Sequence, residues 1–197
     1  MVLSIAELPP EYRAAEPDEE NGVLTLDKIA ESFQGAQLVE YGWESGYMAN
    51  YQVPVGDEEL SGPSIVLSRV DAFKTSDGAA TKLRGPTPTP APTGGSGSPR
   101  RTVSPSEAAA FAEKFHRFEV DLGDDAGGFR LETKLTGEDD SDVLWSAFIT
   151  FRRGRLIGQV SVAAYNLSDK EANELEETAK DLARKMNDQM SAVLAAR

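Results

Sequence analysis

Two segments near the C-terminus show the clearest alternation of apolar and polar positions in the chain. Small or hydrophobic residues take every second position from Val143 to Phe151 and again from Leu156 to Ala164. Such a period of two is typical of β-strands with one buried face. Arg153-Gly154 lies between the segments and supplies the turn. The pattern therefore predicts a β-hairpin over 143–164.

The hydrophobic period changes after this hairpin. From 168 to 195 the apolar residues recur every three or four positions, which is typical of an amphipathic helix. Ser168 and Glu171 have the spacing of a capping box at its start. We expect the apolar stripe to pack on the sheet rather than to receive a partner; it consists of Leu175, Ala179, Leu182, Ala183, Met186, Met190 and Val193.

The first half of the chain carries weaker signals of the same kinds. Thr25 is a candidate N-cap for a helix that ends near Gly35, with an apolar stripe at Leu26, Ile29, Ala30 and Phe33. The later patterns predict a hairpin over 39–53 with its turn at Ser45-Gly46, a strand over 64–73 and a helix over 76–84.

The second half begins with Ser104-Pro105-Ser106-Glu107, which places an N-cap, a proline and an acid where a helix start favours them. We therefore expect a helix over 105–116, followed by an acidic turn at 123–128 and another strand. Each half reads helix–strands–helix. The predicted class is α+β: an antiparallel sheet of about six strands flanked by helices and built from two similar halves.

Composition divides the chain into segments. Residues 1–22 are acidic and aperiodic and predict an extended N-terminal segment, which Leu8 and Tyr12 would pin to the body. Residues 23–197 then form a single α+β domain. Residues 85–104 are rich in Pro, Thr, Gly and Ser and cannot bury a core, so we expect a disordered insertion there.

Charge and composition exclude several function classes. A net charge of −13 argues against nucleic-acid binding and against adhesion to anionic membranes. No run reaches the ~18 apolar residues of a membrane span, and the absence of cysteine removes thiolate chemistry. The start Met1-Val2-Leu3-Ser4 does not have the pattern of a signal peptide. The sequence leaves the compartment and the oligomeric state open.

Catalytic signatures are not evident. His116 is the single histidine, and at the end of the predicted helix it would complement the helix dipole. Asp121, Asp124 and Asp125 precede Gly127-Gly128 and are candidate Ca²⁺ ligands, although they lack the spacing of a known calcium loop. The alternative is a solvated turn that uses Asp and Gly for backbone reasons. No other cofactor is expected.

Two further groups are candidates for ligand binding. Arg152 and Arg153 at the hairpin tip suit a carboxylate or phosphate, or they protect the tip from edge pairing. Aromatic residues could line an apolar cavity or fill the core, and we expect those flanking the predicted turn to reach solvent. This aromatic set consists of Tyr41, Trp43, Tyr47, Tyr51 and Trp145.

Several short motifs carry a family resemblance. They are Leu8-Pro-x-x-Tyr12, the Leu122–Ala126 turn and Phe151-Arg152-Arg153-Gly154, followed by the strand to Tyr165 and the closing helix. In these the chain resembles small extracytoplasmic domains of bacterial lipoproteins and kinase sensor ectodomains, with a fold of the PsbP/Mog1 type. It departs from them in the middle insertion and in having no lipobox cysteine. The resemblance implies a ligand- or partner-binding module and supplies no catalytic residues.

The leading hypothesis is accordingly a non-enzymatic binding or interaction module with an extracytoplasmic location, whose partner is a protein or a small apolar ligand. A small-molecule or lipid carrier with a cavity between sheet and helix is the first alternative. A carboxylate-based hydrolase is the second, because the chain contains 33 acidic residues although nothing singles out a pair of them.

Overall fold

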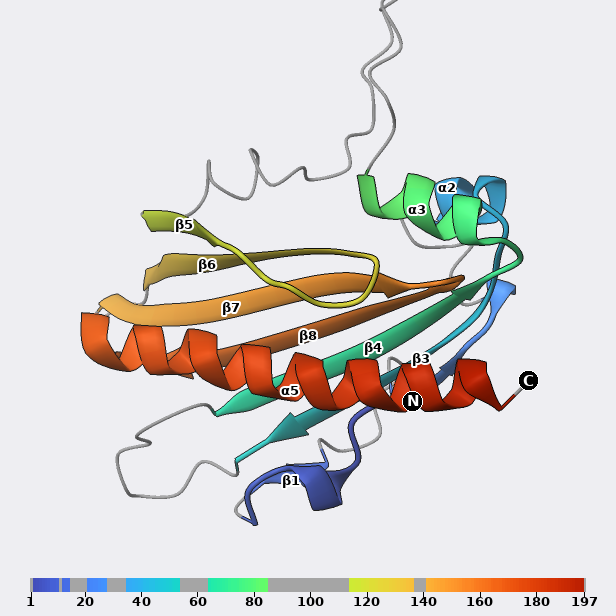
Figure 1. The fold of residues 1–197 in the computed structure, drawn as a ribbon. Helices are drawn as coiled ribbons and strands as arrows, with labels where there is room; N and C mark the ends of the chain where they lie inside the picture. The colour runs from blue at the N-terminus through green and yellow to red at the C-terminus, as the bar shows by residue number, and fades with distance from the viewer. Residues whose placement is uncertain are drawn as a thin grey trace, which may run out of the picture.

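The computed structural model describes residues 2–10, 12–14, 21–27, 35–53, 64–84, 114–136 and 141–196. Within these residues, eight strands form one antiparallel sheet in the order β1-β3-β4-β8-β7-β6-β5, and β2 also pairs with β3 (Figure 1). The α+β class with an antiparallel sheet is confirmed, with eight strands rather than about six. The strands are β1 (Arg13–Ala14), β2 (Gly22–Leu24), β3 (Trp43–Gln52), β4 (Ile65–Phe73), β5 (Lys114–Phe118), β6 (Asp125–Thr136), β7 (Ser141–Arg153) and β8 (Leu156–Tyr165).

The β7–β8 hairpin forms as the alternating pattern predicts. Gly154 in its turn has φ +56°, a left-handed conformation that favours glycine. Phe151 lies opposite Gly158 in the register and is fully buried. A Cβ on Gly158 would lie 2.5 Å from the Phe151 ring. Glycine at this position therefore lets the ring lie flat across the neighbouring strand.

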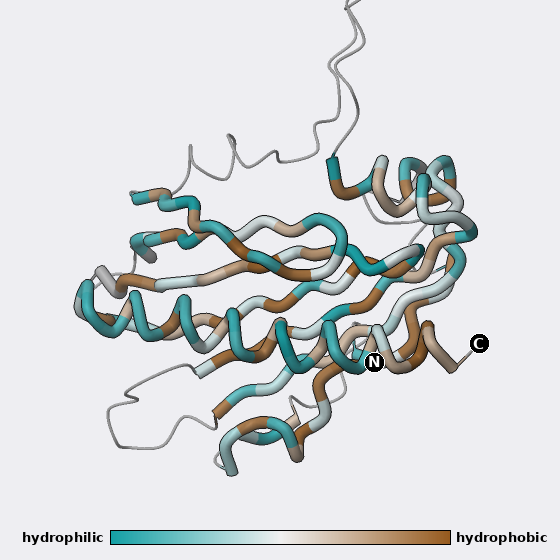
Figure 2. Tube along the Cα trace, in the orientation of Figure 1, coloured by the Kyte–Doolittle hydropathy of each residue, from teal (hydrophilic) through white to brown (hydrophobic). Residues whose placement is uncertain are grey.

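Helix α5 (Asp169–Ala195) covers one face of the sheet, against β7 and β8. Its capping box at Ser168 and Glu171 is present as predicted. Its buried residues pack with the side chains of Ile149, Phe151 and Val160 in the main core. The side of α5 turned to the viewer in Figure 2 is largely hydrophilic, which fits a helix with one buried stripe. The stripe is the sheet-packing face that the sequence predicts.

Two shorter helices, α2 (Gly35–Glu40) and α3 (Ser76–Arg84), lie near one end of the sheet (Figure 1). They contribute to a second, smaller cluster in which Ala79 of α3 packs with Phe73 and Ile157. Ile157 alternates along β8 with the residues that face α5, so this cluster lies on the opposite face. The predicted helix over 76–84 and strand over 64–73 are both confirmed.

The N-terminal segment packs against the body. The 3₁₀ turn η1 (Ile5–Glu7) follows Leu3, which is fully buried. Leu8 and Tyr12 are also buried in the main core, which confirms that they pin the segment. Through β1, the segment also pairs with the outer edge of β3.

The predicted turn at Ser45-Gly46 is wrong. Both residues lie inside β3, which is continuous from Trp43 to Gln52, and Val39 belongs to α2 instead of a first hairpin strand. A Cβ on Gly46 would lie 2.7 Å from Asp71 Oδ1, so this glycine accommodates a close neighbour rather than a turn. The register shifts between Trp43 and Ser45, as in a β-bulge.

The predicted helix over 105–116 is wrong at its end. Residues 114–118 form β5, which pairs with β6, and the Phe115 ring stacks on Phe129 at 5.7 Å. The tertiary pairing outweighs a local helix signal. The acidic turn is also shorter than predicted, because β6 already begins at Asp125.

Other predictions fall partly or wholly outside the described residues. These are the helix from 25 to 35, the start of the helix at 105, and the disordered insertion over 85–104. The described elements give the order α2–β3–β4–α3 and then β5–β6–β7–β8–α5. No helix in the described ranges is both long and apolar enough to span a membrane.

Candidate functional site

An apolar pocket of about 540 Å³ opens between the N-terminal segment and the β3–β4 edge of the sheet. Tyr47 and Tyr51, two of the aromatic candidates, lie in its wall. None of the described side chains that line it is charged. The lining residues are Val2, Leu3, Ser4, Val23, Ser45, Gly46, Tyr47, Tyr51, Val70 and Ala72.

Strand alternation places the two tyrosines on the same face of β3 as α5. Tyr51 is 8% exposed and donates its hydroxyl to Leu3 O at 2.6 Å, while Leu3 N–H donates to Ser68 Oγ at 3.1 Å. Burial raises the pKa of Tyr51, and the charges of Tyr47 and Glu7 add to this. Tyr51 is therefore a neutral structural wall of the pocket.

Tyr47 forms the rim of the pocket. It is 44% exposed and lies directly across from Val23, which is 58% exposed. Exposed apolar side chains that adjoin a concave apolar surface are typical of a binding site. The expectation that Tyr47 reaches solvent is confirmed.

Contacts of Glu7 hold the N-terminal segment over α5. Gln189 Nε2 donates to Glu7 Oε1 at 2.6 Å, and Lys185 Nζ donates to Glu7 O at 3.1 Å. Burial acts to raise the pKa of Glu7, but hydrogen bonds from Ser4 and Gln189 outweigh it, so the pKa lies below its usual range. The ionised carboxylate thus fastens the segment that forms one wall of the pocket.

The remaining aromatic candidates lie elsewhere. Trp43 is 2% exposed, so the expectation that it reaches solvent is wrong. It is buried in the cluster on the opposite face, where its Nε1 donates to Asp71 Oδ1 at 2.8 Å, and Tyr41 packs on the same cluster. Trp145 is buried in the main core with Lys114 and Arg130 each 5.5 Å from its ring centroid. The structure therefore brings together Tyr47 and Tyr51 but not the whole aromatic set.

Arg152 lies at the centre of a polar network at the β7–β8 hairpin. Its Nη2 and Nε donate to Asp125 Oδ2 at 2.9 and 3.2 Å. Its Nη1 contacts Asp124 Oδ2 and Ser76 Oγ, both at 3.0 Å. The hydrogen bond from Arg152 lowers the pKa of Asp125. These contacts direct the guanidinium of Arg152 to the protein's own acceptors.

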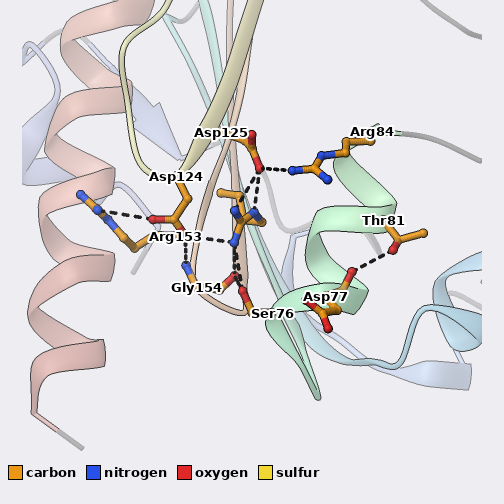
Figure 3. A network of polar contacts seen from close by, with 9 residues as sticks. Ser76, Asp77, Thr81, Arg84, Asp124, Asp125, Arg153 and Gly154 are labelled. Carbon is orange, nitrogen blue, oxygen red and sulfur yellow. Dashed lines mark hydrogen bonds and ion pairs between the residues drawn. The ribbon is translucent and has the colours of Figure 1, made fainter.

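The same network involves other predicted residues. Arg153 Nη1 lies 3.7 Å from Asp124 Oδ1, and Arg84 Nη2 of α3 lies 3.4 Å from Asp125 Oδ2. Figure 3 shows Arg84 reaching Asp125 from α3 and Arg153 reaching Asp124 from the hairpin. The network therefore ties α3, the hairpin turn and the start of β6 together.

The calcium candidates do not gather at one point. Asp124 and Asp125 pair with arginines, while Asp121 lines a small cavity with Lys180 and Arg184. Among the residues that the structure describes, no three His, Asp or Glu side chains are placed to hold a metal ion. His116 is an exposed residue of β5, so it is not at a helix end as the sequence predicts.

A second pocket, of about 490 Å³, was not predicted. It lies between α3 and the face of the sheet opposite α5, and three cationic side chains line it: Lys82, Arg84 and Arg117. The signal available in the sequence was the polar alternate face of the predicted hairpin, at Thr150 and Gln159. Sequence spacing does not reveal that α3 lies above these residues.

Comparisons with known proteins add little. The chain matches no family model and no curated protein. It is similar to the extracellular domain of PknH from Mycobacterium tuberculosis, with 12% identity, a TM-score of 0.43 and coverage of 93% of each chain. This neighbour is a kinase ectodomain, the class that the sequence motifs resemble, but the similarity is too low to carry an argument. The relation to the PsbP/Mog1 type stays a prediction.

Proposed function

We propose that this protein is a non-enzymatic binding module that holds a small apolar ligand in the pocket beside Tyr47 and Tyr51. One observation carries the proposal: ten described residues line a pocket of about 540 Å³, and none of these ten is charged. This volume falls within the ~300–1,000 Å³ typical of pockets for small molecules. Such a pocket favours an apolar ligand because a charged one would lose hydration without gaining a partner.

The chemistry of the wall supports binding rather than catalysis. The titratable side chains among the described lining residues are the two tyrosines, and burial raises the pKa of Tyr51, whose hydroxyl already donates to Leu3 O. These described residues offer no carboxylate, imidazole or amine for proton transfer. The hydroxyls of Ser4, Ser45 and Tyr47 could satisfy one polar group of an otherwise apolar ligand.

The direct test is a titration of the full chain with the neutral fluorescent probe N-phenyl-1-naphthylamine, alongside native mass spectrometry of gently purified protein. Ala72→Phe adds a ring to the pocket wall, and Val23→Glu adds a charge at the rim. Both should abolish saturable probe binding. Val39→Glu is the matched control, because Val39 is 51% exposed and lies outside this pocket.

Two results would contradict the proposal. The first is equal probe binding by the unmodified protein, Ala72→Phe and Val23→Glu. The second is a complete lack of saturable binding by the unmodified protein. An extra mass that is lost on denaturation would instead identify the class of the natural ligand.

A protein partner is the second candidate, and exposed apolar side chains favour it. Val23, Tyr47 and Ile5 are 58%, 44% and 45% exposed, and the first two adjoin the pocket. Val23→Glu would then weaken a protein complex, while native mass spectrometry would show no small bound mass. Asp124 and Asp125 are paired with arginines, which does not favour the hydrolase alternative.

An extracytoplasmic location is part of the same proposal. It rests on the motifs at Leu8–Tyr12, Leu122–Ala126 and Phe151–Gly154. Cell fractionation of the native host, followed by antibody detection, tests it. Recovery in the cytoplasmic fraction alone would refute this part of the proposal and leave the ligand pocket untouched.

A further inference from the structure

The pocket on the opposite face of the sheet is lined by polar and apolar residues from five strands, β4 to β8, and from α3. Thr150 of β7 pairs with both Gly127 of β6 and Gln159 of β8, so these three form one row across the floor. Ile157 and Leu83 add apolar surface at the α3 side. Helix α3 overlies this end of the sheet and encloses the space of about 490 Å³.

Positive charge gathers around this pocket although the chain as a whole carries −13. Lys82 and Arg84 come from the last turn of α3, and Arg117 comes from β5. Two carboxylates also line the pocket, Asp71 and Asp125. Among the described residues, three lining cations against two lining carboxylates leave one formal positive charge.

Each of these carboxylates has its own arginine outside the lining. Asp71 Oδ2 lies 2.9 Å from Arg69 Nε, and Asp125 Oδ2 lies 2.9 Å from Arg152 Nη2. With these two arginines, five described cations lie at the pocket against three carboxylates, because Arg152 also contacts Asp124 at 3.0 Å. The local field therefore favours an anion, in contrast to the acidic surface of the rest of the molecule.

Lys82 and Arg117 would contribute to anion binding in different ways. Burial lowers the pKa of Lys82, with Asp71 acting against this effect and Arg69 acting with it. A partly desolvated ammonium gains more from an anionic ligand than one in bulk water. The Arg117 guanidinium lies 5.7 Å from the Phe115 ring, and no carboxylate in the described part of the chain pairs with it.

We infer that this pocket binds a small molecule that carries a carboxylate or phosphate group and an apolar body. Lys82, Arg84 and Arg117 would hold the anionic group, because ammonium and guanidinium groups form charge-assisted hydrogen bonds to such oxygens. Leu83, Ile157 and Phe129 would contact the apolar body. This site goes beyond the proposed function, because it lies on the other face of the sheet and binds an anionic ligand instead of an uncharged one.

Gly127 gives a sharp test of the location. It lies on the floor of the pocket, has no positive φ, and a Cβ built on it meets no atom within 4 Å. Gly127→Val should therefore fill part of the pocket while keeping the fold. Thr133→Val is a matched control on the same face of the same strand, and Thr133 does not line the pocket.

Calorimetric titrations of the full chain with phenyl phosphate, benzoate and neutral benzamide, at low ionic strength, test the chemistry. We expect saturable binding of at least one anion, weaker binding of benzamide, and a loss of affinity as salt is added. Arg117→Gln and Lys82→Gln should each raise Kd about tenfold. Lys170→Gln is the control, because this substitution removes the same charge at a residue that is 87% exposed on α5. It should leave Kd unchanged.

Preference for phenyl phosphate over benzoate, or the reverse, assigns the anionic group, and either supports the inference. It is overturned if neither anion binds, if benzamide binds as tightly as both, or if Gly127→Val binds like Thr133→Val. Failure of the anion-binding inference can be distinguished from failure of the proposed function. Gly127→Val should leave N-phenyl-1-naphthylamine binding unchanged, and Ala72→Phe should leave anion binding unchanged.

Discussion

Truncation of Leu3 is the most direct test of how the N-terminal segment is held. Leu3 is fully buried in the main core, and its backbone N–H and C=O both make hydrogen bonds to the sheet. Leu3→Ala removes the buried side chain and leaves these backbone contacts available. The substitution therefore isolates the packing of one side chain that lies near the very start of the chain.

The expected magnitude follows from burial. Replacing a buried leucine by alanine costs ~2–5 kcal/mol, because transfer free energy is lost and a cavity remains. For a chain of this size, 1 kcal/mol corresponds to ~2–4 °C in Tm. A central loss of ~3 kcal/mol would therefore lower Tm by ~6–12 °C. Ile5→Ala is the matched control on the same segment, because Ile5 is 45% exposed, and its cost should stay near ~0.5 kcal/mol.

Urea unfolding followed by circular dichroism measures both free energies of unfolding, and thermal scans give the Tm values. The reasoning is refuted if Leu3→Ala and Ile5→Ala lose equally little stability. That result would mean that residues 2–8 dock on a body that is stable without them. The apolar pocket would then lack a permanent wall, because Val2, Leu3 and Ser4 line it.

Three further predictions follow from other parts of the fold. Gly158→Ala should destabilise the protein by ~1–3 kcal/mol in urea unfolding, because its Cβ would lie 2.5 Å from the buried Phe151 ring; stability equal to that of Gly127→Ala would contradict this. The lowered pKa of Glu7 means that this carboxyl binds fewer protons in the folded state than in the unfolded state. Its contribution to the stability of the folded segment is therefore complete above the unfolded pKa and disappears as the pH falls through the folded pKa. The protection of residues 2–8 from hydrogen exchange, corrected for the intrinsic exchange rate at each pH, should therefore fall in acid, and the same pH dependence in Glu7→Gln would argue against it. Limited proteolysis should cut within 85–104 while the two fragments remain associated; separation into two folded pieces would contradict a single domain.

Local pattern was sufficient where an element's signal comes from its own residues. The β7–β8 hairpin, the strand over 64–73 and α5 all follow from periodicity, and α5 begins at the capping box that the sequence shows. These elements bury a regular face, so their period directly reflects the packing. The burial of Leu8 and Tyr12 was also predicted, although residues 1–22 show no period.

Local pattern misled where a distant partner decides the conformation. Residues 114–116 fall in the predicted helix over 105–116 but belong to β5 and pair with β6. Gly46 was predicted to lie in a turn, although it makes room for Asp71 within β3. The candidate site shows the same limit. Trp43, Tyr47 and Tyr51 alternate in sequence, but the register shift between Trp43 and Ser45 turns Trp43 to the opposite face.

By itself, the sequence therefore determined the α+β class, the principal hairpin, and the long helix with its buried stripe. Only the tertiary structure decided which side chains enclose a pocket. Val2 and Ala72 meet at one pocket, and Lys82, Arg117 and Gln159 meet at the other, across long separations in the chain. Periodicity reports which face of an element is buried, whereas a pocket depends on how elements from distant segments pack together.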